Sequence, residues 1–328
     1  MTARGPSEAL PSPRAHLAAT LRLVDTLATQ AGGWSAWPGG QIVREVLDRP
    51  LHLPASVRPD MNGLKYDSYI TQGPSGPAWG VTFNDRWQGR AIWPVLDALA
   101  RDLPGDYDVD RVQRLRRAVP GTSVNVALGF DTPGRPPRLK VYLQEADWRQ
   151  GVLTVGAFAG LSPDLRGGCV LPGVLAPERA LGVLTVVLRP DGSSGLKAYV
   201  GGQSARAVAE VLRGGCPEVD ALAAGMAAAC PSSPAWHYLT IRLEEGQEPR
   251  YALNRIWEHV RVGFGGPTAL EEAWSEVGAL FEVAGRGASF DALRSLRSEL
   301  GALRLVPTAA AYEAGGTSAD VYLAAWPA

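Results

Sequence analysis

The stretch GFDTPGRPPRLKVYLQ, from Gly129 to Gln144, decides which fold this sequence predicts. It has the pattern of two β-strands joined by a proline-rich turn. In the second strand polar and apolar residues alternate, with Arg138, Lys140, Tyr142 and Gln144 in one set and Leu139, Val141 and Leu143 in the other. Successive side chains of a strand point to opposite faces. One face of this strand is therefore apolar and needs a cover, whereas the other carries two cations, a phenol and an amide.

The same pattern returns in LTVVLRPDGSSGLKAYV, from Leu184 to Val200. Here too an apolar strand leads into a turn, and the return strand carries a lysine and a tyrosine two residues apart, Lys197 and Tyr199. Two hairpins that place Lys-x-Tyr on a polar strand face indicate a repeat architecture. They also indicate one binding site built from several strands.

Five two-strand units, separated by helices that are mostly paired, follow one another along the chain. The predicted hairpins span residues 63–84, 123–144, 181–200, 235–254 and 303–326. The predicted helices span residues 16–31, 41–49, 91–103, 108–119, two segments within 204–230, 256–264, 268–284 and 289–302. We expect Ser289 to cap the last of these helices. The turns within each unit are short, so the sheet is antiparallel, and ten such strands remove their edges most easily by closing. We therefore predict an α+β fold of ααββ repeats, in which helices surround a ten-stranded antiparallel β-barrel. This single domain covers residues 15–328, and residues 1–14 form a flexible N-terminal arm.

The two faces of the barrel strands differ in character. The apolar outer faces, for example Val124, Val126 and Leu128, need a cover, which the helices supply. The polar faces line the lumen, and a ten-stranded barrel is wide enough to hold a ligand. Residues 151–177 are rich in Gly and Pro with weak helix signals, and they either cover or widen the mouth of the barrel.

Charge and composition narrow the classes of function. The chain has 328 residues and a net charge of −1, so no overall basic field indicates nucleic acid or a membrane as partner. The N-terminal MTARGPSEALPSPR lacks the apolar stretch of a signal peptide, and the three cysteines form no Cys-x-x-Cys motif, so we expect a cytoplasmic protein. The acidic residues of DYDVDR, residues 106–111, lack the spacing of a calcium loop and indicate the start of a helix instead. No metal site is predicted.

The predicted lumen combines cations with tyrosines. Lys140 and Lys197 enter a partly enclosed space from separate strands, where an ammonium group without an anionic partner is costly. Together with Arg138 they suit a diphosphate, whose charge is compact. Tyrosines from four strands can shield a carbocation through the negative faces of their rings: Tyr142, Tyr199, Tyr251 and Tyr322. A solvated polar sheet face is the alternative interpretation, and a non-catalytic barrel that binds an anionic or aromatic small molecule is the alternative function.

Four stretches, GFDTPGRPPRLKVYL, GLKAYV, PRYALNR and DVYLAAW, resemble the aromatic prenyltransferases of the ABBA type. Within that family they are similar to the indole (dimethylallyltryptophan synthase-like) and the cyanobactin peptide prenyltransferases. Each motif is short, but the pattern covers most of the chain. The resemblance implies metal-independent transfer of a prenyl group from an allylic diphosphate, dimethylallyl or geranyl, to an aromatic acceptor. That acceptor is Trp or another indole, or Tyr, free or within a peptide.

The resemblance also implies roles for individual residues. The Lys-x-Tyr strands would hold the diphosphate and the tyrosines would shield the allyl cation, and the residues that match these motifs are Lys140, Tyr142, Lys197, Tyr199, Tyr251 and Tyr322. The chain departs from the family at two places. The position two before Tyr251 is Pro249 rather than a cation, and the family's arginine on the second strand would fall near Gly80. The candidates to replace that arginine are Lys65, Arg242 and Arg250.

The family's acidic residue on the first strand, which takes a proton from the acceptor, is also displaced. Lys65 occupies the expected position. Asp67 lies two residues further along the same strand face, and Asp60 lies just before the strand. We favour Asp67 as the base or acceptor-binding carboxylate, and Asp60 takes that role if the strand is shifted by one residue.

Overall fold

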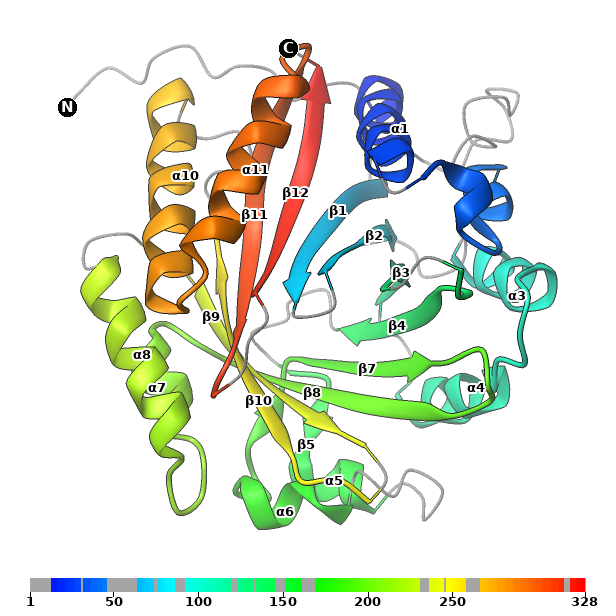
Figure 1. Cartoon of the computed structure of the whole chain (residues 1–328). Helices are drawn as coiled ribbons and strands as arrows, with labels where there is room; N and C mark the ends of the chain where they lie inside the picture. Colours follow the sequence, from blue (N-terminus) through cyan, green and yellow to red (C-terminus); the bar gives the residue numbers. More distant parts are fainter. Residues whose placement is uncertain are drawn as a thin grey trace.

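Ten strands form one closed antiparallel barrel in this computed structural model, which describes residues 13–30, 32–45, 64–73, 76–85, 92–119, 123–131, 134–144, 151–160, 169–230, 236–244, 246–257, 266–315 and 319–327. The strands follow the order β1-β12-β11-β10-β9-β8-β7-β4-β3-β2 around the barrel (Figure 1). Pairing of β12 with β1, in which Tyr322 lies opposite Tyr69, closes the sheet. The predicted ten-stranded antiparallel barrel is confirmed.

The barrel strands belong to five hairpins, as the alternation of the sequence predicted. They are β1 (Leu64–Gly73), β2 (Gly76–Asp85), β3 (Ser123–Phe130), β4 (Arg138–Gln144), β7 (Val183–Leu188), β8 (Ser194–Gly202), β9 (Trp236–Leu243), β10 (Arg250–Ile256), β11 (Leu303–Glu313) and β12 (Ala319–Pro327). Each of these strands pairs with its sequence neighbour in the hairpin and with a strand of the adjacent hairpin. Residues far apart in the sequence therefore face one lumen.

Helices cover the outside of the barrel. They are α1 (Pro13–Gln30), the 3-10 helix η1 (Trp34–Ala36), α3 (Ile92–Asp102), α4 (Val109–Ala118), α7 (Ala205–Ala209), α8 (Pro217–Ala229), α10 (Gly266–Val283) and α11 (Gly287–Glu299). Among their contacts, α3 packs on β3, α4 on β7, α7 on β9, α8 on β10 and α10 on β11. None of the helices within the described residues is long and apolar enough to cross a membrane.

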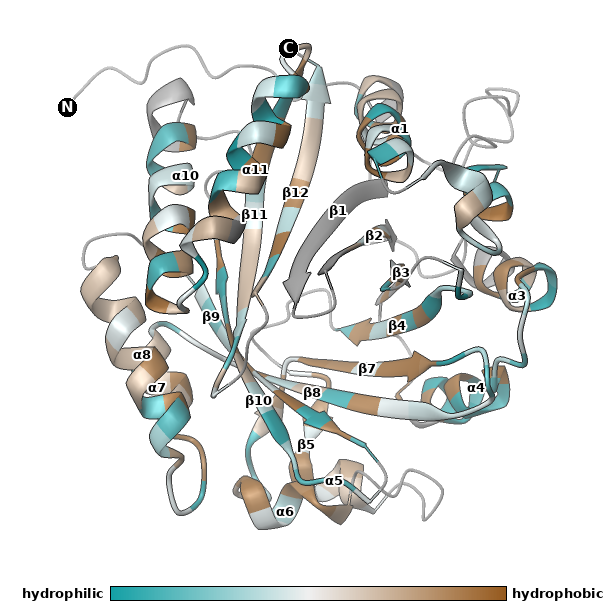
Figure 2. Cartoon of the chain, viewed as in Figure 1, coloured by the Kyte–Doolittle hydropathy of each residue, from teal (hydrophilic) through white to brown (hydrophobic). Residues whose placement is uncertain are grey.

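The core lies between the strands and these helices. Val124, Val126 and Leu128 on β3 are at most 1% exposed and belong to one large apolar cluster. In Figure 2, β7 is coloured as hydrophobic along most of its length, and β4 shows alternating bands. The predicted division into an apolar outer face and a polar inner face is confirmed for β4, whereas the inner face of β7 carries Val183 and Val187 beside Thr185.

A small two-stranded unit stands beside the barrel. Strand β5 (Leu153–Thr154) pairs with β6 (Ala180–Leu181), and the short helices α5 (Val155–Ala159) and α6 (Leu171–Val174) lie between them. In Figure 1 this unit lies next to β8 and β10, outside the ring of strands. The N–H of Gly182 donates to the carbonyl of Tyr199 on β8 at 2.7 Å, so the unit is fixed to the barrel wall.

The helix boundaries follow local capping chemistry. The side chain of Asp108 accepts a hydrogen bond of 3.2 Å from the N–H of Arg111, so DYDVDR is the start of α4, as predicted. The predicted cap of the last helix is wrong. Gly285, with φ of 68°, ends the preceding helical segment, and α11 already begins at Gly287, so Ser289 lies inside its first turn.

Two other boundaries differ from the prediction. Helix α1 begins at Pro13, within the predicted N-terminal arm, and residues 1–12 of that arm lie outside the described residues. The helix predicted over residues 256–264 starts too early, because Ile256 pairs with Trp236 as the last residue of β10. Residues 258–265 lie outside the described residues.

Candidate active site

Four cations from three strands meet in the lumen or at its rim. Their side chains alternate with buried apolar residues on the same strands, so they lie on the inner face. They are Arg138 and Lys140 on β4, Lys197 on β8 and Arg242 on β9. Lys197 lies directly opposite Arg242 in the strand register, and Lys140 is only 4% exposed. The lumen thus concentrates positive charge in a space with little water.

Burial and mutual repulsion weaken the protonated form of both lysines. Burial, and then repulsion from Arg138, lower the pKa of Lys140 to about 8. The pKa of Lys197 falls well below its usual range, again first through burial and then through Arg242 and Lys140. Desolvation and like charges both disfavour an ammonium group. A bound anion would reverse these effects, so the arrangement is suited to an anionic ligand.

Carboxylates neutralise the arginines more fully than the lysines. Asp131 forms a two-pronged ion pair with Arg138 at the end of β4. Glu313 on β11 lies 3.7 Å from Arg242 and 3.8 Å from Arg250. Near the lysines, Asp131 and then Asp320 raise the pKa of Lys140, and Asp320 raises that of Lys197, in each case against the larger effect of burial.

Tyrosine rings line the same lumen next to the lysines. The rings of Tyr142 and Tyr199 are 6.4 Å apart between centroids, and the rings of Tyr199 and Tyr238 are 6.1 Å apart at right angles. Tyr322 and Asp320 lie near enough to Tyr142 to influence its pKa. Burial raises the pKa of Tyr142 well above its usual value, and that of Tyr199 to about 12. The phenols therefore stay neutral in the lumen.

Known structures share this barrel over nearly the whole chain. A 5-dimethylallyl tryptophan synthase from Streptomyces coelicolor, in complex with DMASPP and Trp, matches with a TM-score of 0.63 over 96% of this chain and 95% of that chain at 17% identity. A 6-dimethylallyltryptophan synthase from Micromonospora olivasterospora, in complex with DMASPP and Trp, matches with a TM-score of 0.63 over 96% and 98% at 18% identity. The fold is that of these prenyltransferases.

The likeness extends to a fungal protein. AnaPT from Neosartorya fischeri matches with a TM-score of 0.59 over 80% of this chain and 78% of that chain at 13% identity. No family model matches the sequence, and no curated protein matches it. The predicted resemblance to the ABBA-type prenyltransferases is therefore confirmed at the level of the fold.

One tyrosine that the sequence assigned to the prenyltransferase lumen lies elsewhere. Tyr251 pairs with Ile241, a fully buried residue of the outer core, and itself packs against that core. Its pKa is raised by burial and then by Cys216, which precedes α8. The prediction of Tyr251 as a shielding residue is therefore wrong, because a strand alternates strictly and Tyr251 shares the outer face with Leu253. Tyr238, one strand away on β9, lies in the lumen instead.

The predicted acids are placed only in part. Asp67 lies opposite Thr82 in the pairing of β1 with β2, and the ladder continues from Thr82 through Ala127 to Lys140. The side chain of Asp67 lies outside what the structure describes, as does the whole of Asp60. The role of either residue as a base stays a prediction.

Glycines surround the position at which the family's second-strand arginine would lie, so another cation has to replace it. Gly80 lies opposite Gly129, and Gly129 lies opposite Arg138. Of the three candidates to replace that arginine, Arg242 faces the two lysines closely enough to lower the pKa of both. Arg250 is 49% exposed and pairs with Glu244 at 3.1 Å. Lys65 has no described side chain.

Sequence reasoning missed two lumen residues that alternation could have found. In WHYLTIRL, Tyr238 shares its parity with Arg242, and the intervening leucines and isoleucine belong on the core side. Asp320 precedes Tyr322 by two residues and so lies on the same face of β12. Both residues could have been assigned to the lumen from the period of two. The short motifs around the tyrosines do not show by themselves which face of the strand a tyrosine occupies.

Proposed function

We propose that this protein is an aromatic prenyltransferase that transfers a dimethylallyl or geranyl group from its diphosphate to an aromatic acceptor. The observation that carries the proposal is the meeting of the buried Lys140 and the half-buried Lys197 with a cluster of tyrosine rings inside a barrel of prenyltransferase fold. The acceptor is a tryptophan or another indole, or a tyrosine. Two of the similar structures are complexes with DMASPP and Trp.

The cations bind and hold the donor diphosphate. Lys140, Lys197 and Arg242 surround one space and repel one another when it is empty. A diphosphate relieves this repulsion, and each charge-assisted hydrogen bond to it is stronger than a neutral one. The same contacts stabilise the diphosphate as a leaving group, because the electron pair of the breaking carbon–oxygen bond goes to it.

The tyrosines shield the allyl cation that this bond cleavage leaves behind. The ring faces of Tyr142, Tyr199 and Tyr238 attract positive charge and exclude water. An electron-rich atom of the acceptor then forms a bond to the allyl carbon. A proton leaves the acceptor and goes to a carboxylate, for which Asp67 is our first candidate and Asp60 the second.

The lysines and arginines take the charge-neutralising role that a divalent metal has in other diphosphate enzymes, so we propose that the reaction needs no metal. Within the described residues, no group of three or more His, Cys, Asp or Glu residues could hold a metal ion. A strict requirement for magnesium would count against this part of the proposal.

Incubation of the protein with donor diphosphates and a panel of indoles, phenols and peptides, in the presence of EDTA, tests the proposed function. We expect a prenylated aromatic product, identified by mass and by NMR. Tight binding of a diphosphate or an aromatic compound without product from any pair would favour a non-catalytic binding barrel.

The proton acceptor needs a separate test. We expect Asp67→Asn to lose most product formation while it still binds the donor, because the amide cannot take the proton. Asp60→Asn is the matched comparison. Full turnover by Asp67→Asn together with an inactive Asp60→Asn would transfer the role to Asp60.

A further inference from the structure

A chain of ion pairs runs along one rim of the barrel and ends at a cation of the lumen. Its members alternate in charge: Arg189, Glu244, Arg250, Glu313 and Arg242. The Oε1 atom of Glu244 accepts a hydrogen bond from Arg189 at 2.8 Å and another from Arg250 at 3.1 Å. Glu313 lies 3.8 Å from Arg250 on one side and 3.7 Å from Arg242 on the other. A single carboxylate thus joins Arg242 to the ion pairs of the rim.

Glu313 lies on the face of β11 that lines the lumen. It is the last residue of the strand and pairs with Ala252, which in turn pairs with Thr240 on β9. Thr240 shares its strand face with Arg242, because one residue separates the two. The side chain of Glu313 is 15% exposed, so water and salt screen its charge only in part. The carboxylate therefore acts on the same space as the lumen cations.

The two lumen arginines differ in how firmly a carboxylate holds them. Asp131 contacts Arg138 through both of its carboxylate oxygens. Arg242 lies too far from Glu313 for a hydrogen bond, and its buried Nε atom has no hydrogen-bond partner among the residues that the structure describes. Arg242 can therefore turn its N–H groups to another anion without losing a hydrogen bond to Glu313.

Glu313 stays beside the diphosphate site when Arg242 turns away from it. Arg250 lies on its other side and is itself held by Glu244. The negative charge is therefore fixed at the rim, and it opposes a bound diphosphate in two ways. It attracts Arg242 away from the ligand, and it repels the phosphate oxygens.

The proposed reaction explains why a competing carboxylate is useful. The diphosphate that leaves the donor is held by the same cations that bind the donor. Interactions that bind both equally well do not accelerate the chemical step. Diphosphate that remains in the lumen also blocks the next donor molecule.

We propose that Glu313 competes with diphosphate for Arg242, so that it lowers the affinity of the lumen for this product and promotes its release. The inference rests on the proposed function, in which inorganic diphosphate is formed in each turnover. It assigns Glu313 to product release and not to proton transfer.

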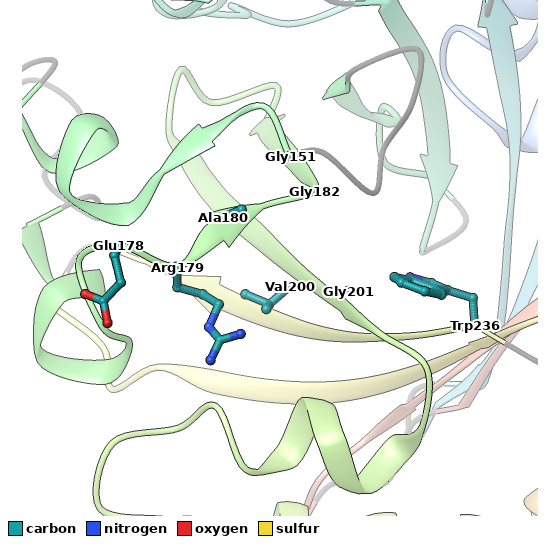
Figure 3. Close-up of a pocket in the computed structure, with 8 residues that line it drawn as sticks. All are labelled: Gly151, Glu178, Arg179, Ala180, Gly182, Val200, Gly201 and Trp236. Atoms are coloured by element: carbon teal, nitrogen blue, oxygen red, sulfur yellow. The ribbon is translucent and has the colours of Figure 1, made fainter.

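A matched control lies at the opposite end of β9. Figure 3 shows a hollow of about 430 Å³ there, and Glu178 and Trp236 are among the residues that line it. Trp236 is the first residue of β9, and Arg242 follows six positions later, about 20 Å further along an extended strand. Glu178 is exposed and carries the same charge as Glu313, but it lies far from the rim that holds Arg242.

Calorimetric titration of the full chain with inorganic diphosphate, at pH 7 and constant ionic strength, tests this inference. We expect Glu313→Gln to bind diphosphate about three- to tenfold more tightly than the wild type, because a like charge beside the site has been removed. Glu313→Asp draws the carboxylate back by one methylene group and should lower the Kd by a smaller factor. Glu178→Gln should keep the wild-type Kd.

Arg242→Gln distinguishes competition from a general change in structure. In that background Glu313→Gln should change the Kd by a clearly smaller factor, since the cation for which the two anions compete is gone. The inhibition constant of diphosphate in the prenyl transfer should fall in Glu313→Gln by the same factor as the Kd.

A Kd that Glu313→Gln leaves unchanged or raises would overturn the inference, as would no binding of diphosphate or an equal effect of Glu178→Gln. An effect of Glu313→Gln that is as large without Arg242 as with it would also overturn it. If Glu313→Gln did not fold, a Kd that Glu313→Asp leaves unchanged or raises would decide in the same way. Prenylated product together with an unchanged Kd would retain the proposed function and reject this role of Glu313. Tighter diphosphate binding by Glu313→Gln, without product from the wild type, would do the reverse.

Discussion

Cations lie on both sides of the barrel wall, Arg255 on the outside and Lys140 with Lys197 in the lumen. Arg255 on β10 points outward and is 2% exposed, and its carboxylate partner is Glu276 of α10. The Oε2 atom of Glu276 accepts from Nε of Arg255 at 3.0 Å, from Nη2 at 2.8 Å and from the indole of Trp257 at 2.6 Å. Neutral His237, whose pKa burial and Arg255 lower to about 4, lies 3.3 Å from the same guanidinium. The inner set, Lys140 and Lys197, lies among other cations, and burial together with Arg138, Arg242 and their mutual repulsion depresses the pKa values of both.

The difference separates a structural ion pair from a binding site. A buried charge with a complete set of partners stabilises one arrangement of the fold, and its loss leaves a partner unpaired. A desolvated charge that is repelled by neighbouring cations is held at a cost that an incoming anionic ligand can remove. The fold therefore supports the lumen lysines at the expense of stability, and the ligand regains that free energy on binding.

The largest effect should come from breaking the outer pair. We expect Glu276→Gln to lower the free energy of unfolding by about 3–5 kcal/mol, because Arg255 remains buried without a counter-ion. Urea denaturation of the purified protein measures this. The double variant Arg255→Met/Glu276→Leu should lose much less, since it removes both charges together. An equal loss in the single and double variants would mean that packing, and not charge, sustains this cluster.

The inner lysines should show the opposite behaviour. We expect Lys140→Met and Lys197→Met each to weaken donor binding by about 1.5–3 kcal/mol, through loss of one charge-assisted contact. Unfolding stability should stay equal or rise, because a desolvated ammonium has been removed. Calorimetric titration with a diphosphate analogue and urea denaturation of the same samples provide both readouts. Unchanged donor affinity in both variants would remove the diphosphate site from the lumen.

The fold could be predicted from the sequence because strands such as β4 and β8 carry the period of two. Leu139, Val141 and Leu143 alternate with polar residues, and only a closed sheet with helices outside accommodates both faces. Helix ends were less predictable. Helix α11 starts at Gly287 because the chain turns at Gly285, just after α10. Ser289 is a good capping residue, but its presence in the sequence does not show where that turn lies.

The site was predictable only where alternation and motif agreed. Lys140, Lys197, Tyr142 and Tyr199 satisfy both, and the structure brings them together. The partners from other strands, such as Asp320 and Arg242, depend on register across the barrel. Register is set by pairing over many residues, and a single strand carries little information about it.

Donor binding should weaken as the pH rises. The folded pKa of Lys140, about 8, lies below the ordinary lysine value of 10.5, so between these values the unfolded chain binds more protons than the empty enzyme. Considering this group alone, the free energy of unfolding of the empty enzyme therefore rises with pH over that window. Donor affinity falls over the same window, because the neutral amine cannot pair with the diphosphate. We expect the donor Kd to rise about tenfold from pH 7 to pH 9, measured by titration at constant ionic strength. Lys140→Met should flatten both dependences, and a wild-type Kd that is constant over this range would contradict the assignment.

The smallest effect tests which side of the wall a tyrosine occupies. Tyr238 lies in the lumen against Tyr199, and Tyr251 lies on the outer face, partly buried against the core. Loss of a ring that faces the cation should cost about 0.5–2 kcal/mol of transition-state stabilisation, so we expect Tyr238→Leu to lower kcat several-fold. Tyr251→Leu should leave the kcat of the folded enzyme within about twofold, since its ring never meets the cation. Single-turnover rates at saturating donor and acceptor, corrected for the folded fraction, make the two variants comparable. If Tyr251→Leu lowered kcat as much as Tyr238→Leu, packing on the outer face of β10 would have to influence the lumen. The distinction between the two sides of the barrel wall would then be wrong.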